Sequence, residues 1–213
     1  MSGIIDLLNS DLGKQIIGGI SQETKQPADK TASVVAMAMP ILLGAMKRNA
    51  SSDDGATNLM NALNNKHDGS ILDNLNGLFG GGVNEDVKQD GLGILGHVLG
   101  GSQNNAVQAL SKKSGLDTNS VMQILQVAAP ILLGYLGKQK QQQNVNSESG
   151  IGDLLGGLMG GNGKQPQQQS LIESILDGNN DGSVIDDIAG MVLGGSNQKK
   201  SGLGGLLGGL FGK

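Results

Sequence analysis

The sequence contains no cysteine and very few aromatic residues. Without cysteine the chain forms no disulfide, binds no zinc through thiolates and has no thiol nucleophile. Tryptophan is absent, and the aromatic residues are one tyrosine and two phenylalanines. Any hydrophobic core must therefore consist of aliphatic side chains.

The sequence also lacks a basic surface, because its formal net charge is −4 at pH 7. Nucleic-acid binding needs a positive field that displaces counterions from phosphates. The densest basic pairs, Lys47-Arg48, Lys112-Lys113 and Lys199-Lys200, are typical of solvated helix ends. A nucleic-acid-binding helical protein, for example one with a helix-turn-helix, remains an alternative that the charge balance disfavours.

No secretory signal is recognised at the amino terminus, where Asp6, Asp11 and Lys14 interrupt the apolar residues. We therefore expect a cytoplasmic protein. A transmembrane helix needs about 18 or more uncharged apolar residues, and the nearest stretch, 32–46, is shorter and contains Pro40. We expect no transmembrane segment.

Apolar residues recur every three or four positions through residues 1–140, which predicts an all-α domain. The string Pro-Ile-Leu-Leu-Gly occurs at Pro40–Gly44 and again 90 positions later at Pro130–Gly134. This predicts an internally duplicated helical domain with two proline-kinked helices, since proline removes a helical N–H. We expect the two helices to cross closely at the small residues Gly44 and Gly134.

Three further segments follow the predicted domain. Residues 141–169 are rich in Gln and Gly and are interpreted as a linker with a short helix. Residues 170–195 are predicted to form a helix-loop-helix, and 196–213 a flexible tail rich in Gly and Leu. Apolar residues at helical spacing in this tail are expected to bind a protein partner, to self-associate or to contact a membrane surface peripherally. They are Leu203, Leu206, Leu207, Leu210 and Phe211.

An Asp-rich string in residues 177–187 resembles the start of an EF-hand-like or dockerin-like calcium loop, with oxygen-bearing residues at alternate positions. The expected calcium ligands are Asp177, Asn179, Asp181, Ser183, Asp186 and Asp187. Position 12 of the loop is Ile188, where an EF-hand has glutamate. The alternative is an Asn/Gly turn followed by a helix cap.

The capping interpretation has support from a repeat. Asp68-Gly69-Ser70-Ile71-Leu72-Asp73 recurs 113 positions later as Asp181-Gly182-Ser183-Val184-Ile185-Asp186. Ser70 with Asp73, and Ser183 with Asp186, fit the capping-box pattern of serine followed three residues later by an acid.

Only two histidines are present, His67 and His97. A catalytic base needs a nucleophile to activate, and the sequence has neither a cysteine nor a Gly-x-Ser-x-Gly elbow. We therefore expect a protein that is not an enzyme. The alternative is a hydrolase that uses His67 with Asp68 or His97 with Asp90.

Three motifs in order resemble the bacterial DUF937 (YidB-like) family: the string His67–Leu75, the string Asp90–Gly100 and the two Pro-Ile-Leu-Leu-Gly segments. The resemblance spans about residues 1–140 and implies a bacterial, all-helical protein. It brings no catalytic residues, because the family has no assigned function. The leading hypothesis is a non-enzymatic helical scaffold or protein-interaction module that binds calcium through its tail loop.

Overall fold

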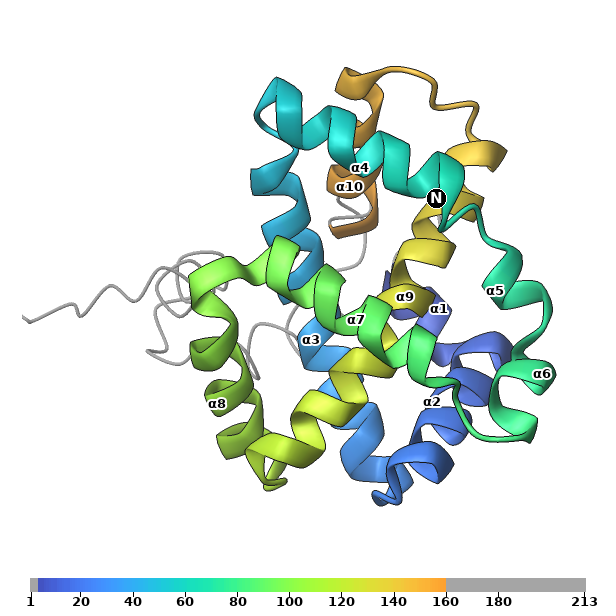
Figure 1. Ribbon diagram of the computed structural model, residues 1–213, viewed down its shortest axis with the longest axis vertical. Helices are drawn as coiled ribbons and strands as arrows, with labels where there is room; N and C mark the ends of the chain where they lie inside the picture. Colours follow the sequence, from blue (N-terminus) through green and yellow to red (C-terminus); the bar gives the residue numbers. More distant parts are fainter. Residues whose placement is uncertain (1–3, 160–213) are drawn as a thin grey trace, which may run out of the picture.

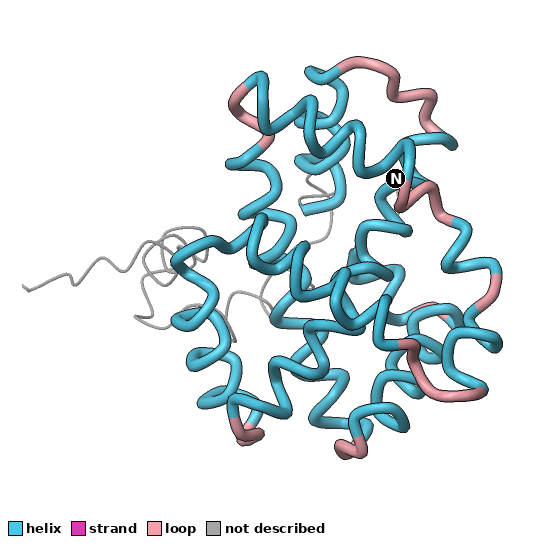
Figure 2. Tube along the Cα trace, in the orientation of Figure 1, coloured by secondary structure: helices cyan, strands magenta, loops and turns pink. Residues whose placement is uncertain are grey.

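The computed structural model describes residues 4–159, which form ten α-helices and one 3-10 turn, with no strand among them. Short loops join the helices (Figure 2). In chain order the elements are α1 (Ile4–Asn9), α2 (Asp11–Thr24), α3 (Ala28–Asn49), α4 (Asp53–Asn65), α5 (Ser70–Asp73), α6 (Leu75–Gly80), α7 (Glu85–Leu99), the 3-10 turn η1 (Gly100–Ser102), α8 (Gln103–Ser114), α9 (Thr118–Gln142) and α10 (Glu148–Met159). The all-α prediction is confirmed for these residues.

Two long helices, α3 and α9, form the centre of the fold, and the other helices pack around them (Figure 1). Their apolar residues make up much of a single aliphatic core. Pro40 lies inside α3 and Pro130 inside α9, and both helices continue through their prolines. Proline therefore does not end either helix.

Both central helices have the length and hydropathy of membrane-spanning helices, which the sequence analysis did not expect. The most apolar windows of α3 and α9 have mean hydropathies of 1.2 and 1.5, and 61% and 83% of those windows are buried within the fold. Core helices of soluble proteins share these properties. Burial in the described core accounts for their composition.

The turn between α2 and α3 has the same hydrogen bond as the turn between α8 and α9. The Ser21 hydroxyl donates to the carbonyl of Gln26 at 2.7 Å, and the Ser111 hydroxyl donates to that of Leu116 at 2.6 Å. Both donors and both acceptors are 90 positions apart. The two turns thus close in the same way.

The last residues before these turns also correspond. Lys25 follows α2 at φ 54° and Gly115 follows α8 at φ 69°, so both helices end on a left-handed residue. One position earlier, Thr24 and Ser114 each donate a hydroxyl hydrogen bond of 2.7 Å to the carbonyl four residues back. These pairs share the same 90-residue offset.

Helix packing repeats this correspondence. The helix before each central helix contacts both central helices: α2 packs on α3 and α9, and α8 packs on α9 and α3. The helix after each central helix packs on the opposite one, since α4 contacts α9 and α10 contacts α3. The sets α2–α4 and α8–α10 therefore pack on each other reciprocally, each with its last helix on the central helix of the other set.

Helix α10 belongs to the compact fold, although the sequence analysis placed its residues in a linker and ended the domain at residue 140. It packs on α3, α4 and α9. It begins after Ser147, whose hydroxyl accepts the N–H of Gly150 as Ser52 accepts that of Gly55 at α4. Its stripe of apolar residues is buried: Ile151, Leu154, Leu155 and Leu158.

The predicted close crossing of the central helices at their glycines is wrong. A β-carbon at Gly134 would overlap the Cγ2 atom of Ile71, which lies on α5. A β-carbon at Gly44 would meet only the end of the Met159 side chain, at 3.7 Å. The two glycines thus face peripheral helices, because the central helices contact each other through other faces.

The proline of α9 has a second role in packing. Pro130 has no N–H, so the carbonyl of Gln126, four residues earlier, has no helical donor. Gly91 of α7 lies directly over this carbonyl, and a β-carbon at Gly91 would overlap the Gln126 oxygen. Glycine lets α7 approach closely enough for a Cα–H to contact the freed oxygen. This approach fixes the position of α7 on α9.

Candidate functional site

A groove of about 580 Å³ lies between α4 and α7, above the carboxyl-terminal end of α3 and the middle of α9. Residues of both helices line it, and α4 and α7 do not pack closely on each other. Aliphatic side chains form its floor and walls. Met46 and Leu133 lie at the floor, with Leu59, Ala62, Ile94 and Val98 along the sides.

Charged groups meet at one end of the groove, where the end of α4 reaches α7. Lys66 Nζ lies 2.5 Å from Asp90 Oδ1, and His67 Nε2 lies 3.5 Å from the other oxygen of the same carboxylate. His67 is 7% exposed. Burial lowers the pKa of His67 below its ordinary value of 6.5, against the opposite effect of Asp90. A neutral imidazole therefore lies beside the carboxylate at neutral pH.

Uncharged contacts hold the other end of the groove. The side-chain amide of Asn49 donates to the carbonyls of His97 and Val98, at 3.1 and 3.3 Å, and so ties α3 to the last turn of α7. The Ser52 hydroxyl donates to the Asn49 carbonyl at 3.0 Å and accepts the N–H of Gly55. Both ends are thus fixed by polar contacts, while the side chains between them are mainly apolar, with Asn58 among them.

The structure pairs the predicted site residues differently from the sequence analysis. His67 meets Asp90, whereas the predicted pairs were His67 with Asp68 and His97 with Asp90. His97 is exposed at the opposite end of the groove. The hydroxyl that lines the groove, Ser52, is engaged in capping α4. The arrangement gives His67 a carboxylate to orient it but no nucleophile to activate.

Sequence reasoning found both histidines but missed the groove. Lys66 and Asn49 are single polar residues at helix ends, and nothing in their local pattern indicates a partner. The contacts depend on how α4, α7 and α3 meet in space. Within residues 4–159, no group of three or more His, Cys, Asp or Glu side chains is placed to hold a metal ion.

The predicted calcium ligands, from Asp177 to Asp187, and the predicted partner-binding residues, from Leu203 to Phe211, lie outside the described residues. The first copy of the repeated Asp-Gly-Ser string is described, and it forms a turn. Asp68 Oδ1 accepts the N–H of Ser70 at 3.0 Å, and Gly69 has φ 109°. The hydrogen bonds from Ser70 lower the pKa of Asp68 below its ordinary range.

The predicted capping box of Ser70 with Asp73 is wrong in this copy. Gly69 occupies the N-cap position of α5, and no side chain caps the helix. Asp73 instead forms an ion pair with Lys138 of α9, with Nζ and Oδ1 2.8 Å apart. The aspartate three residues after the serine thus serves to attach α5 to α9.

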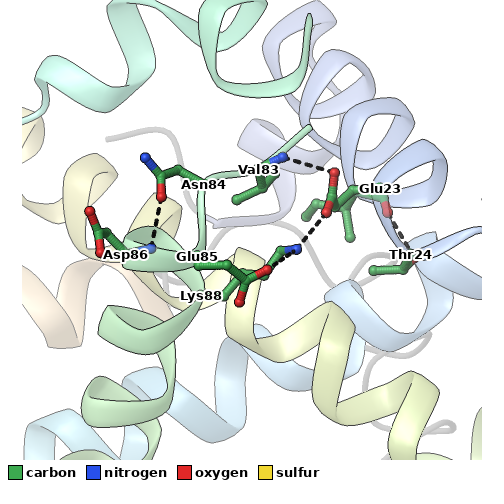
Figure 3. Close-up of polar contacts among 8 residues, drawn as sticks. Glu23, Thr24, Val83, Asn84, Glu85, Asp86 and Lys88 are labelled. Carbon is green, nitrogen blue, oxygen red and sulfur yellow. Dashed lines mark hydrogen bonds and ion pairs between the residues drawn. The ribbon is translucent and has the colours of Figure 1, made fainter. Parts of the chain in front are cut away.

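A second polar cluster fixes the start of α7 against α2 (Figure 3). The Glu23 carboxylate accepts the N–H of Val83 at 2.9 Å and pairs with Lys88 at 2.9 Å, while Lys88 also contacts Glu85 at 3.0 Å. Burial raises the pKa of Glu23, but the hydrogen bonds from Lys88 and Val83 outweigh it and lower the pKa overall. These contacts position α7, and hence one wall of the groove.

The fold and the groove define the class of protein: an all-helical bundle with an apolar groove between two of its outer helices. The chain belongs to the DUF937 family. The sequence model of this family, described as "Bacterial protein of unknown function (DUF937)", matches residues 6–139 and 142–213. Neither a curated protein nor a solved structure matches the chain.

Proposed function

We propose that this bacterial protein is a non-enzymatic helical scaffold that binds the apolar face of a helix from another protein in the groove between α4 and α7. The observation that carries the proposal is the composition of the groove. Its floor and walls are aliphatic, and its charges are paired with one another at one end. Such a surface gains free energy by covering apolar area rather than by recognising charge.

The shape of the groove favours a helical occupant. Residues of α4 and its two caps line it along the entire helix: Ser52, Gly55, Asn58, Leu59, Ala62 and Lys66. This face is about 21 Å long at a rise of 1.5 Å per residue. A partner helix of roughly four turns, with leucines every three or four residues, matches that length.

We further propose that the fold contains two copies of one helical unit, α2–α4 and α8–α10, as the repeated sequence suggests. Support comes from the equal hydrogen bonds at the Ser21 and Ser111 turns and from the reciprocal packing of the outer helices. On this basis the first copy contributes α4, which forms one wall of the groove.

Methyl-resolved NMR of the full chain tests groove binding. The probe is a synthetic 18-residue amphipathic peptide with leucines on one face and serines on the other. We expect saturable shifts at the methyl groups of Leu59, Ile94 and Val98. The variant Ala62→Trp fills the groove and should abolish these shifts. The matched variant Ala28→Trp, at an exposed position outside the groove, should retain them.

Two results would contradict the proposal. In the first, the peptide shifts methyl groups elsewhere, such as those of the exposed Leu92, equally in both tryptophan variants. In the second, decanoate shifts the groove methyl groups and the peptide does not, which would make the groove a site for acyl chains.

A further inference from the structure

The two central helices differ in how much of one face is covered. On α9 this face contains Gln126, Pro130 and Gly134, and α5 and α7 pack on it. The positions 90 residues earlier on α3 are Ala36, Pro40 and Gly44. Pro130 and Gly134 are buried, whereas Ala36 is exposed and Pro40 and Gly44 are only half-buried. The equivalent face of α3 is therefore open.

The sequence contains a second copy of the segment that covers α9. Residues 68–82, which include α5 and α6, align with 181–195 at an offset of 113, and apolar positions stay apolar at 71, 72, 75, 78 and 79. Seven positions are identical: Asp181, Gly182, Ser183, Asp186, Gly190, Gly194 and Gly195.

The correspondence extends into α7. Asp-Gly-Leu-Gly at 90–93 aligns with Ser-Gly-Leu-Gly at 201–204, and the buried Leu95 and Leu99 align with Leu206 and Leu210. The offset here is 111 instead of 113, so the second copy has two residues fewer than the first between these two aligned segments. The family model also matches this region of the chain, within 142–213.

We propose that residues 181–210 form a second copy of α5–α7 that docks on the open face of α3 within the same chain. The proposal assigns the face formed by Ala36, Pro40 and Gly44 to this segment. It goes beyond groove binding, because the α3 face and the α4–α7 groove are separate surfaces.

Charge supports this placement. In the described copy, Asp73 pairs with Lys138 on α9. The residue 90 positions before Lys138 is Arg48, and the residue 113 positions after Asp73 is Asp186. Arg48 is exposed and forms no ion pair with the described residues. The repeat at an offset of 90 supplies the cation, and the repeat at an offset of 113 supplies the anion. In the proposed arrangement Asp186 is therefore the partner of Arg48 rather than a calcium ligand.

Side-chain size is also complementary. On α2, a β-carbon at Gly19 would overlap the ring of Phe79 from α6, so a large residue packs against a glycine. The counterparts are Ala109 on α8 and Val192. Val192 is smaller than Phe79, and Ala109 is larger than Gly19. The combined side-chain volume of the two residues is therefore similar in both pairs.

The freed carbonyl of α3 gives a third reason. Pro40 leaves the carbonyl of Ala36 without a helical donor, as Pro130 does for Gln126. In the described copy Gly91 lies directly over the carbonyl oxygen of Gln126. Its counterpart in the second copy is Gly202. Glycine therefore occurs again where the backbone of one helix must approach the freed oxygen of another.

One contact of α7 has no counterpart. The pair of Glu23 with Lys88 corresponds to Lys113 with Lys199, which repel each other. The beginning of the second α7 copy is therefore held by its apolar residues alone. In this arrangement Leu206 and Leu210 face α3. Leu203, Leu207 and Phe211 face outward, like the exposed Leu92, Gly96 and Gly100 of α7.

The absence of cysteine makes cross-linking a direct test on the full chain. The variant pair Arg48→Cys and Asp186→Cys is treated with a short bismaleimide and mapped by mass spectrometry after proteolysis. The positive control is Lys138→Cys with Asp73→Cys, whose side chains meet in the structure. The negative control is Arg48→Cys with Asp73→Cys.

We expect an intrachain cross-link at 48–186 with a yield within about twofold of the positive control. A yield at the level of the negative control would overturn the proposal. A cross-link between two chains would also overturn it, because the α3 face would then be covered by a second copy of the protein.

Discussion

Thr31 is a polar residue in the apolar core. Its side chain is fully buried near the start of α3, and its hydroxyl has no hydrogen-bond partner among the described residues. The residue 90 positions later is Val121, which is also fully buried. Val121 thus has a side chain of the same shape as that of Thr31, with a methyl group in place of the hydroxyl.

Replacing Thr31 by valine should therefore stabilise the protein. We expect Thr31→Val to raise the free energy of unfolding by about 1 kcal/mol, since an unpaired buried hydroxyl costs roughly that much. Urea denaturation followed by circular dichroism measures the change. The reverse variant, Val121→Thr, is the matched control and should lower it. A loss of stability in Thr31→Val would show that the hydroxyl has a partner.

His67 makes stability depend on pH. Burial depresses its pKa in the folded state, so the unfolded chain takes up a proton first as pH falls below about 6.5. The free energy of unfolding should thus be highest above pH 6.5 and fall with acidification, by at most about 1.4 kcal/mol per pH unit. Denaturation between pH 7.5 and 5.5 measures this slope.

One variant assigns this slope to His67. His67→Gln should remove most of the slope that the wild-type protein shows. A slope equal to that of the wild type would mean that other groups cause the pH dependence.

At the scale of elements, the position of α7 depends on one glycine. Gly91 lies over the freed carbonyl of Gln126, while Gly93, two residues along the same helix, has open space around it. We expect Gly91→Ala to lower the free energy of unfolding by about 1–3 kcal/mol through overpacking. Gly93→Ala should be neutral or raise it by up to about 1 kcal/mol, since alanine favours helix. Thermal and urea denaturation compare the two, and equal effects would contradict this account of α7.

Helix α10 provides a second element to test. Leu155 is 1% exposed, whereas Met159 on the same helix is 38% exposed. Leu155→Ala should lower the free energy of unfolding by about 2–5 kcal/mol, and Met159→Ala by less than about 1 kcal/mol. Denaturation curves measure both. If Leu155→Ala had no effect, α10 would be dispensable to the core.

The sequence indicates elements better than it indicates their contacts. Apolar periodicity predicts the helices of the described residues. The predicted crossing at Gly44 and Gly134 is wrong, and α10 packs on the fold, although its residues were interpreted as part of a linker. Those features depend on which face of a helix meets which neighbour, and small residues or Gln-rich composition do not specify it.

The candidate site was predictable only in part for the same reason. Both histidines were recognised, but the pairing of His67 with Asp90 requires α4 and α7 to lie across a groove from each other. The residues involved come from segments more than twenty positions apart, and their local patterns fit ordinary helix ends. Spacing along one helix could not reveal them.

For the whole molecule, we propose that the chain is built from two copies of one unit, each with a central helix whose outer face is covered. The covering segment of α9 is α5–α7, and we propose that residues 181–210 cover α3. Calcium binding by the string at 177–187 competes with this account, because Asp181 and Asp186 would be needed for the turn and for Arg48.

Hydrogen exchange of the full chain, measured by mass spectrometry on a peptide covering residues 34–48, reports whether another segment covers the outer face of α3. Docking raises the free energy of local opening and so slows exchange. We predict that Leu206→Asp with Leu210→Asp, on the face that we propose lies toward α3, increases deuterium uptake in this peptide, while Leu203→Asp with Leu207→Asp, on the face that we propose lies outward, leaves it unchanged. Equal uptake in the two double variants would contradict the account.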